Sequence, residues 1–338
     1  MNNHVEKRRP AIPAVSAAVR PLIAENTPLW SLTSMRVGGP ACWFAKPKTV
    51  AELETIYSWA LHESIAVTIL GGGTNVLFSD AGYAGMVIST RRLKGIRVSD
   101  TSVIAAAGER LSELAGKMNR AGLAGLEWAC GIPGTVGGAV VMNAGAHDGD
   151  MAAVLESVQV LTSAGVREWP VDDLELSYRS SALRTGRLEG IVLEVSLKLQ
   201  RADPAQCVKR EQAVMAKRLK TQPRGASSGC IFKNPATGPS AGELLDRAGC
   251  KGMRVGAAVV SDIHANFIIN EGQNNAADVL ALIDRMRTKV LKHHGIALQP
   301  EVHLINTTEQ GTDAVLDVNP PLAVDGGRLR HSCRWHEQ

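Results

Sequence analysis

The sequence predicts an α+β protein made of three successive units. Its 338 residues are more than one hydrophobic core comfortably organises, so two or three domains are expected. Segments with the apolar spacing of helices are interspersed with short runs in which apolar and polar residues alternate, as in half-buried strands. The chain contains no internal repeat. These observations favour a multidomain α+β fold of ordinary globular type.

The first unit covers residues 21–92, after a leader at 1–20 that we expect to be disordered. TVAELETIYSWALH at 49–62 predicts a helix, because T-x-x-E forms a capping box and the apolar residues make one stripe. AVTIL at 66–70 and GMVIST at 85–90 predict strands. The unit is therefore expected to be a compact α/β arrangement.

The second unit covers residues 93–203. A strand is predicted at VIAAAG and a helix at 111–121, followed by a glycine-rich stretch. Three alternating runs separated by turn residues then predict antiparallel strands: ESVQVLT at 156–162, VREWPV at 166–171 and IVLEVSLKL at 191–199.

The third unit covers residues 204–306 and is again of α+β type. Helices are predicted at 208–221, 241–249 and 276–294, and strands around VVSD, NFIIN and PEVHLI. Residues 307–338 are rich in turn and polar residues, which predicts a loosely ordered tail.

Composition excludes several functions. The net charge is +4, the basic residues are interleaved with acids, and only 4% of residues are aromatic, which argues against nucleic-acid binding. No apolar run approaches the ~20 residues that span a bilayer. The six cysteines include no C-x-x-C pair, so no metal site is predicted. Because Pro10 and Pro13 interrupt the apolar segment near the start, we expect no export signal and a cytoplasmic protein.

Two glycine-rich loops are the strongest local signals. GGGTN at 71–75 follows a strand, where consecutive glycines permit positive φ and let backbone N–H groups surround an anion. It is neither a Rossmann fingerprint nor a Walker loop, so its residues alone leave phosphate binding and a plain tight turn equally open. The stretch at 131–150 contains many glycines, with Pro133 fixing one bend, and favours backbone lying against a large ligand over a long surface loop.

Together, the two loops resemble the flavin domain of the vanillyl-alcohol-oxidase type over roughly residues 25–200. This resemblance implies non-covalent FAD between two subdomains, 21–92 and 93–203, with a substrate-binding domain at 204–306. The first loop would bind the FAD diphosphate, and I-P-G-T-x-G-G would line the cofactor. The cofactor residues implied are Gly71, Gly72, Gly73, Thr74, Asn75, Gly131, Pro133, Gly134, Thr135, Gly137, Gly138, Asn143 and Arg179.

Four further motifs resemble the UDP-N-acetylenolpyruvoylglucosamine reductase family: TSMRVGGPA, LSYRSS, SxGCxFKNP and QPEVHLI. The resemblance runs from about Asn26 to Ile305, and the chain lacks room after LSYRSS for the extra tyrosine-bearing loop of one subgroup. It implies that NADPH reduces FAD, which then reduces UDP-N-acetylglucosamine enolpyruvate to UDP-N-acetylmuramate for peptidoglycan synthesis. We expect a monomer.

The same resemblance implies three catalytic residues. Cys230, where most relatives resemble a serine, would donate a proton, because a thiol with a pKa near 8.5 is protonated at neutral pH. Taken alone, such a cysteine is more often an inert thiol. Arg179 would bind the substrate carboxylate, although a surface pair with Glu175 is equally compatible with the sequence. Glu301 would act as an acid beside that carboxylate, although an acid at a strand start is usually solvated.

The substrate-binding residues expected near these motifs are Tyr178, Lys220, Gln222, Lys233 and Asn234. Amide and ammonium groups at these positions would suit the diphosphate of the substrate.

Two other functions remain open on the sequence. A flavin oxidase or hydroxy-acid dehydrogenase of the same cofactor fold would react rapidly with O₂ and often attaches its flavin covalently, but His62 and His147 lack a supporting motif. A non-catalytic nucleotide-binding module would keep the glycine loops and would not need Cys230, Arg179 and Glu301 together.

Overall fold

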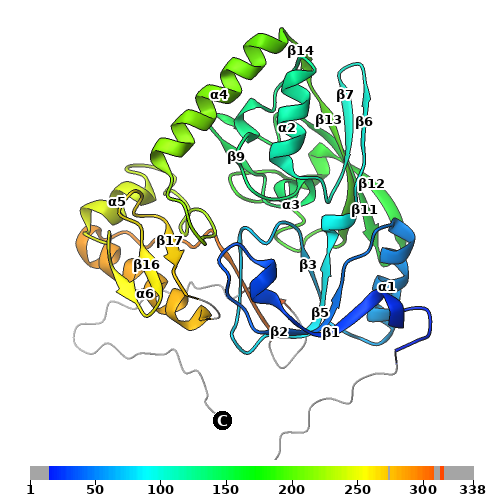
Figure 1. The fold of residues 1–338 in the computed structure, drawn as a ribbon, viewed down its shortest axis with the longest axis horizontal. Helices are drawn as coiled ribbons and strands as arrows, with labels where there is room; N and C mark the ends of the chain where they lie inside the picture. Colours follow the sequence, from blue (N-terminus) through cyan, green and yellow to red (C-terminus); the bar gives the residue numbers. More distant parts are fainter. Residues whose placement is uncertain (1–14, 273–274, 308–312, 316–338) are drawn as a thin grey trace, which may run out of the picture.

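The computed structural model describes residues 15–272, 275–307 and 313–315. Most of the predicted leader at 1–20 and of the predicted tail at 307–338 lies outside the described residues. Figure 1 shows the first sheet at the bottom with α1 at its right, the second sheet above it, and the third unit on the left, beyond the helix α4.

A four-stranded sheet forms the centre of the first unit, with the strand order β1-β2-β5-β3. β1 is antiparallel to β2, whereas β2, β5 and β3 are parallel to one another. The helix α1 (Val50–His62) packs its apolar stripe against this sheet. Parallel strands end at one edge of a sheet, where ligand-binding loops commonly lie. The strands are β1 (Ile23–Pro28), β2 (Pro40–Ala45), β3 (Val67–Leu70) and β5 (Tyr83–Ser89).

The start of α1 confirms the predicted cap. Thr49 Oγ1 accepts a hydrogen bond from the backbone N–H of Glu52 at 3.1 Å. The Glu52 carboxylate in turn accepts from the backbone N–H of Lys48 at 2.6 Å, one residue earlier than in the usual capping box.

A five-stranded antiparallel sheet with the order β12-β11-β13-β7-β6 forms the second unit. The helices α2 (Leu111–Arg120) and α3 (Val136–Val141) share one hydrophobic core with this sheet. The strands are β6 (Ile96–Ser99), β7 (Ser102–Ala106), β11 (Leu155–Thr162), β12 (Gly165–Pro170) and β13 (Ile191–Lys198); two short pairs join β8 (Leu123–Ala124) to β14 (Gln200–Arg201) and β9 (Gly145–Ala146) to β10 (Gly149–Asp150).

The second glycine-rich stretch contains a helix that the sequence did not indicate, because glycine is a poor helix former. Thr135 caps α3 by accepting a hydrogen bond from the Gly138 N–H at 3.4 Å. Close packing explains a glycine inside this helix, since a Cβ at Gly137 would lie 2.8 Å from the Ala107 Cβ. Tertiary packing thus overrides local propensity here.

The long helix α4 (Pro204–Thr221) connects the second unit to the third. The third unit has a small antiparallel sheet in the order β15-β16-β17, which shares a core with α5 (Ala241–Arg247) and α6 (Ala276–His294). Its strands are β15 (Arg254–Val255), β16 (Ala258–Val260) and β17 (Ile268–Asn270).

After α6 the chain returns to the first unit. β18 (His303–Thr307) pairs in parallel with β4 (Val76–Phe78), and β19 (Asp313–Val315) lies on its other side. The strand predicted at PEVHLI therefore forms, but its neighbour is the segment that directly follows the GGGTN loop. This pairing brings Glu301 close to the first glycine loop.

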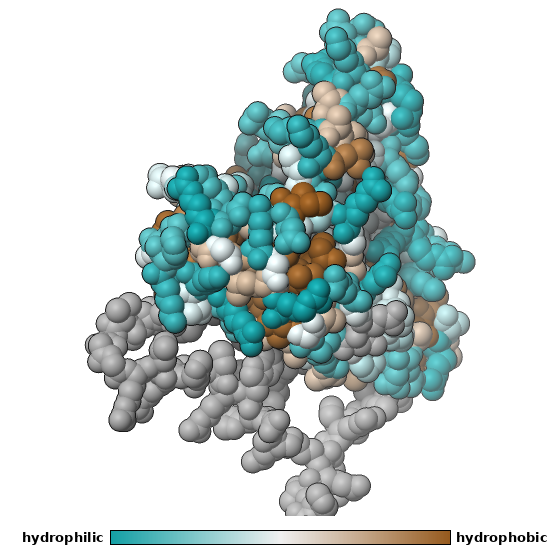
Figure 2. Space-filling model, turned by 60° about the vertical axis from the view of Figure 1, so that its left-hand side comes forward, coloured by the Kyte–Doolittle hydropathy of each residue, from teal (hydrophilic) through white to brown (hydrophobic). Residues whose placement is uncertain are grey.

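The face shown in Figure 2 is hydrophilic over most of its area, with smaller hydrophobic areas near the middle. In the part of the chain that the structure describes, every helix is too short or too polar to cross a membrane.

Candidate active site

Arg179, Glu301 and Cys230 meet at one place, although they come from three distant segments. Arg179 Nε donates a hydrogen bond to Glu301 Oε1 at 2.7 Å, and both side chains are largely buried. Both groups are near enough to Cys230 to influence the pKa of its thiol. The structure therefore assembles the three predicted catalytic residues into one cluster.

A tight turn presents Arg179. Ser177 and Ser180 exchange two backbone hydrogen bonds of 3.1 and 3.0 Å, so the two residues between them form the tip of the turn. Arg179 has a φ of 55°, in the left-handed region that few residues other than glycine adopt. Its Nη2 donates to the Gly145 carbonyl oxygen at 2.7 Å, which leaves the guanidinium little freedom.

The sequence left open a pair between Arg179 and Glu175, and the structure does not form it. Glu175 forms an ion pair with Arg187 instead, on the exposed side of this segment. The Arg179 charge is thus directed to Glu301.

The backbone of Glu301 is held from both sides. Its N–H donates to the Ile231 carbonyl at 2.7 Å, and its carbonyl accepts from Asn75 Nδ2 at 3.2 Å. Burial raises the pKa of the Glu301 carboxyl above its usual value, although the neighbouring cations, Arg179 first, oppose the rise. A carboxyl in this setting retains a proton to higher pH than an exposed glutamate does.

Cys230 lies on a segment whose backbone contacts both the third unit and the segment that carries Glu301. Cys230 forms an isolated antiparallel β-bridge with Phe267, and Phe232 forms another with Pro300. Burial raises the pKa of the thiol to about 12; Glu301 adds to the rise, and Arg179 opposes it. The pKa of this thiol therefore lies above the value near 8.5 of a free cysteine, and the thiol stays protonated throughout the neutral range.

The two glycine loops touch each other. Thr74 Oγ1 donates to the Pro133 carbonyl at 3.2 Å. A Cβ at Gly72 would lie 2.5 Å from the Gly134 Cα, and a Cβ at Gly71 would lie 2.5 Å from Thr135 Oγ1. The glycines are required by this close approach of two backbones, and not only by backbone conformation.

Positive φ angles occur at Gly73 (65°), Gly131 (80°) and Gly134 (130°). Gly72 does not adopt one. The expectation that consecutive glycines permit positive φ therefore applies to Gly73 in the first loop.

The hydrogen bonds of the first loop fit an anionic ligand. Its carbonyl oxygens are engaged: those of Gly71 and Gly72 by Arg91, that of Gly73 by the Ser34 N–H. By contrast, the backbone N–H groups of residues 72–75 find no acceptor among the described residues. Successive unpaired N–H groups form a concave donor site for phosphate. This arrangement fits the diphosphate of FAD, which the first loop would hold.

Asn143 supports the Arg179 turn. Its Nδ2 donates to the Ser177 carbonyl at 3.0 Å, and its Oδ1 accepts from the Ala152 N–H at 3.0 Å. Both ends of the amide are thus engaged by the protein, which connects α3 to the turn that carries Arg179.

The predicted substrate residues differ in their relation to this cluster. Lys233 lies close to it: burial lowers the pKa of its ammonium group, and Arg184 lowers it further, whereas Glu301 opposes the change. Tyr178 is 53% exposed, and its ring centroid lies 5.3 Å from the Arg179 Cζ. Asn234 is exposed and accepts a hydrogen bond from the Ala241 N–H at the start of α5.

Lys220 and Gln222 lie at the end of α4, and the structure shows no side-chain contact between either residue and the cluster among the described residues. Their roles remain predictions.

Two cations near the cluster were missed from the sequence. Arg184 Nη2 contacts the Glu301 carbonyl oxygen at 3.5 Å, and burial lowers the pKa of its guanidinium. Arg218 lies on α4. Burial lowers the pKa of its guanidinium, and the nearby Cys230 opposes that change. A Cβ at Gly131 would lie 3.0 Å from the Arg218 Cδ, so this side chain covers the second glycine loop. Neither residue belongs to a glycine- or proline-rich motif, and no sequence signal indicates its burial.

Comparisons with known proteins agree with this site. The family model for the C-terminal domain of UDP-N-acetylenolpyruvoylglucosamine reductase matches residues 221–305, and that for an FAD binding domain matches residues 42–169. The chain is 43% identical to the UDP-N-acetylenolpyruvoylglucosamine reductase of Gloeobacter violaceus over 278 residues, 81% of this chain and 93% of the relative. The chain belongs to the UDP-N-acetylenolpyruvoylglucosamine reductase family.

Further relatives support this assignment. The reductase of Synechococcus sp. (strain JA-3-3Ab) is 44% identical over 88% of this chain and 96% of its own length. The crystal structure of the reductase from Thermus caldophilus matches with a TM-score of 0.71 and 38% identity, covering 83% of this chain and 97% of that one. The predicted family, the α+β fold class with an FAD-binding module, and FAD and NADPH as cofactors are confirmed.

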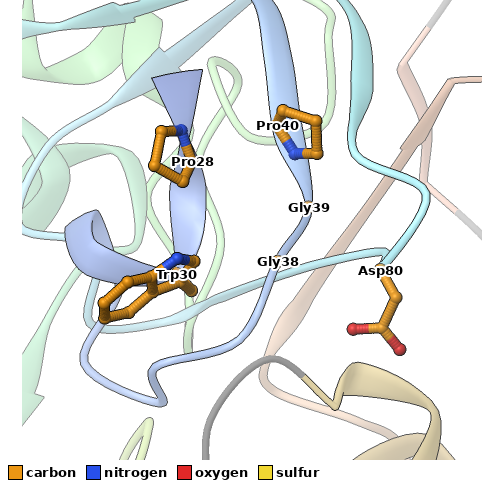
Figure 3. Close-up of a pocket in the computed structure, with 6 residues that line it drawn as sticks. All are labelled: Pro28, Trp30, Gly38, Gly39, Pro40 and Asp80. Carbon is orange, nitrogen blue, oxygen red and sulfur yellow. The ribbon is translucent and has the colours of Figure 1, made fainter. Parts of the chain in front are cut away.

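A separate pocket of about 250 Å³ lies at the surface of the first unit, where β1 ends and β2 begins (Figure 3). Pro28, Trp30, Pro40 and Asp80 line it, together with two glycines, and none of them is a predicted site residue. The Asp80 carboxylate accepts hydrogen bonds from the first N–H groups of α6, at 2.7 and 3.0 Å, so this pocket lies where the first and third units meet. No cluster of metal-binding side chains occurs in the described residues.

Replacing Gly72 by alanine is expected to weaken FAD binding by about tenfold or more, because the new Cβ would collide with the backbone of the second loop. Titration of the apoprotein with FAD measures the effect. Gly116→Ala on α2 is the control, since its Cβ would meet only the ends of flexible side chains. Unchanged FAD affinity in Gly72→Ala would contradict the contact between the two loops as the basis of the cofactor site.

Replacing Glu301 by glutamine is expected to leave reduction of the flavin by NADPH intact and to slow reduction of the enolpyruvyl substrate by about 10²-fold, the usual effect of losing an acid catalyst. Stopped-flow absorbance follows each half-reaction separately. Glu175→Gln is the matched control, because Glu175 pairs with Arg187 outside the cluster. Equal slowing of both half-reactions would indicate a structural role for Glu301.

Proposed function

We propose that this chain reduces UDP-N-acetylglucosamine enolpyruvate to UDP-N-acetylmuramate, using NADPH as the source of the hydride. The observation that carries the proposal is the cluster of Arg179, Glu301 and Cys230 beside the first glycine loop. Asn75 of that loop donates to the Glu301 carbonyl, so the cofactor loop and the reacting groups share one framework. The family supports the same activity.

FAD, held by the first glycine loop, would supply the hydride chemistry that links NADPH to the terminal carbon of the enolpyruvyl double bond. Hydride addition moves negative charge toward the substrate carboxylate. The guanidinium of Arg179 is fixed by two hydrogen bonds and offers a permanent positive charge for that carboxylate. The raised pKa of Glu301 suits a carboxyl group that lies beside the substrate carboxylate and shares a proton with it.

Cys230 supplies the remaining proton. The adjacent substrate carbon takes the thiol proton, which leaves a thiolate that regains a proton from water. Arg179 and Arg218 both lower the pKa of this thiol and therefore stabilise the thiolate while it exists. One hydride and one proton are thereby added across the double bond.

The cellular part of the proposal is that the chain acts as a monomer in the cytoplasm, in peptidoglycan precursor synthesis. Both proposed reactants, a UDP-linked sugar and NADPH, are anionic molecules, which suits the cations around Glu301. Light scattering tests the monomer, and fractionation of the source cells tests the location.

Replacing Cys230 by alanine is expected to leave NADPH oxidation intact and to slow substrate reduction by about 10²-fold or more, because the proton donor is lost. Cys230→Ser should keep much of the activity, since a hydroxyl can also donate. Stopped-flow measurement with prereduced flavin isolates this half-reaction. A fully active Cys230→Ala would exclude Cys230 as the donor.

The pH dependence provides a second test of Cys230. With a thiol pKa raised to about 12, the proton is lost only far above neutrality. The rate of substrate reduction should therefore depend on pH in the same way in the wild-type protein and in Cys230→Ser up to roughly pH 10, whatever the difference between their absolute rates. An ionisation near pH 8.5 that occurs in the wild type and is absent from Cys230→Ser would show that the thiol is not held protonated by its surroundings.

A further inference from the structure

Arg91, which is not among the predicted site residues, binds the first glycine loop. Its Nε donates to the Gly71 carbonyl at 3.1 Å, and its Nη2 donates to the Gly72 carbonyl. The same Nη2 also lies 3.4 Å from the Leu32 carbonyl. The guanidinium of Arg91 thus contacts three backbone carbonyl oxygens at the edge of the loop.

The sheet explains why Arg91 reaches this loop. Gly71 follows β3 and Arg91 lies just after β5, and these neighbouring strands are parallel, with Leu70 paired to Ser89. Both residues therefore lie at the carboxyl edge of the sheet, where ligands bind in folds of this kind.

Peptide geometry links these carbonyls to the unpaired N–H groups. In a planar trans peptide, the N–H of one residue points opposite to the C=O of the residue before it. By binding the carbonyls of Gly71 and Gly72, Arg91 therefore turns the N–H groups of Gly72 and Gly73 away from itself. These N–H groups have no acceptor among the described residues. They can therefore bind a ligand on the side of the loop that faces away from Arg91.

We propose that Arg91 is a positioning residue for the cofactor: it fixes the carbonyl side of the first glycine loop and thereby aims the N–H groups of Gly72 and Gly73 at the FAD diphosphate. Its positive charge, with that of Arg110 nearby, further favours a bound anion at this edge. The inference rests on FAD binding by this chain. It means that a residue outside the glycine motifs orients the N–H groups that bind the diphosphate.

The test compares Arg91→Gln, Arg91→Lys and the control Arg92→Gln. Arg92 is the neighbouring arginine, is exposed, and its side chain makes no hydrogen bond or ion pair with the described residues. FAD is removed from each purified protein, and the affinities for FAD and for ADP are measured by calorimetric titration. ADP is the second probe because it carries the diphosphate without the flavin ring.

Arg91→Gln should weaken binding of FAD and ADP by the same factor, about tenfold to a hundredfold, the range for hydrogen bonds that involve a charged group. Arg91→Lys keeps the charge but not the fork of donors, so it should recover less than half of this loss on a logarithmic scale. Arg92→Gln should bind both ligands as the wild type does.

Thermal unfolding separates positioning from general stabilisation. The apoproteins of Arg91→Gln and the wild type should unfold at similar temperatures, whereas the increase produced by FAD should be smaller in Arg91→Gln. An equal loss of stability with and without FAD, an unchanged ADP affinity, or full recovery by Arg91→Lys would overturn the proposal. Failure of the wild-type protein to bind FAD would instead contradict the proposed function.

Discussion

The ion pair between Arg179 and Glu301 is the interaction on which the rest of the site depends. The two residues are 122 positions apart in sequence and their charged groups approach to 2.7 Å. Several separate contacts are needed to bring them together: the tight turn at Ser177–Ser180, the parallel pairing of β18 with β4, and the hydrogen bond from Glu301 to Ile231. A buried pair of this kind is retained where breaking it would leave an unpaired charge.

The electrostatic balance around this pair indicates why the site suits an anionic substrate. Glu301 is one carboxylate, whereas Arg179, Arg184 and Lys233 are cations close enough to influence its pKa. Burial lowers the pKa values of Arg184 and Lys233, which shows that their charges are imperfectly solvated. A substrate that brings a carboxylate and a diphosphate would compensate this excess of positive charge.

Much of the fold could be predicted from sequence because its signals are local. The capping box at Thr49, the apolar stripe of α6 and the alternation in β11 and β13 depend on residues close in sequence. The resemblance of short motifs was enough to indicate the family. By contrast, α3 was missed because packing against Ala107 outweighs the poor helix propensity of its glycines.

The geometry of the site could be predicted only in part. The three proposed catalytic residues were chosen from motifs, but the sequence could not decide whether Arg179 forms a surface pair with Glu175 or faces the substrate carboxylate, because ion pairing depends on non-local contacts. Burial likewise moves the Cys230 pKa far from its usual value, which no local pattern reveals. Arg91 was missed because its role depends on the pairing of β3 with β5.

A double-mutant cycle between Arg179 and Glu301 tests the central role of this ion pair most directly. The rate of substrate reduction by prereduced enzyme is measured for Arg179→Gln, Glu301→Gln and the double variant. If the two residues act as one unit, the double variant should be about as slow as the slower single variant, so that the effects are strongly non-additive. If the two effects simply multiply, the two residues act independently, and the ion pair does not organise the site.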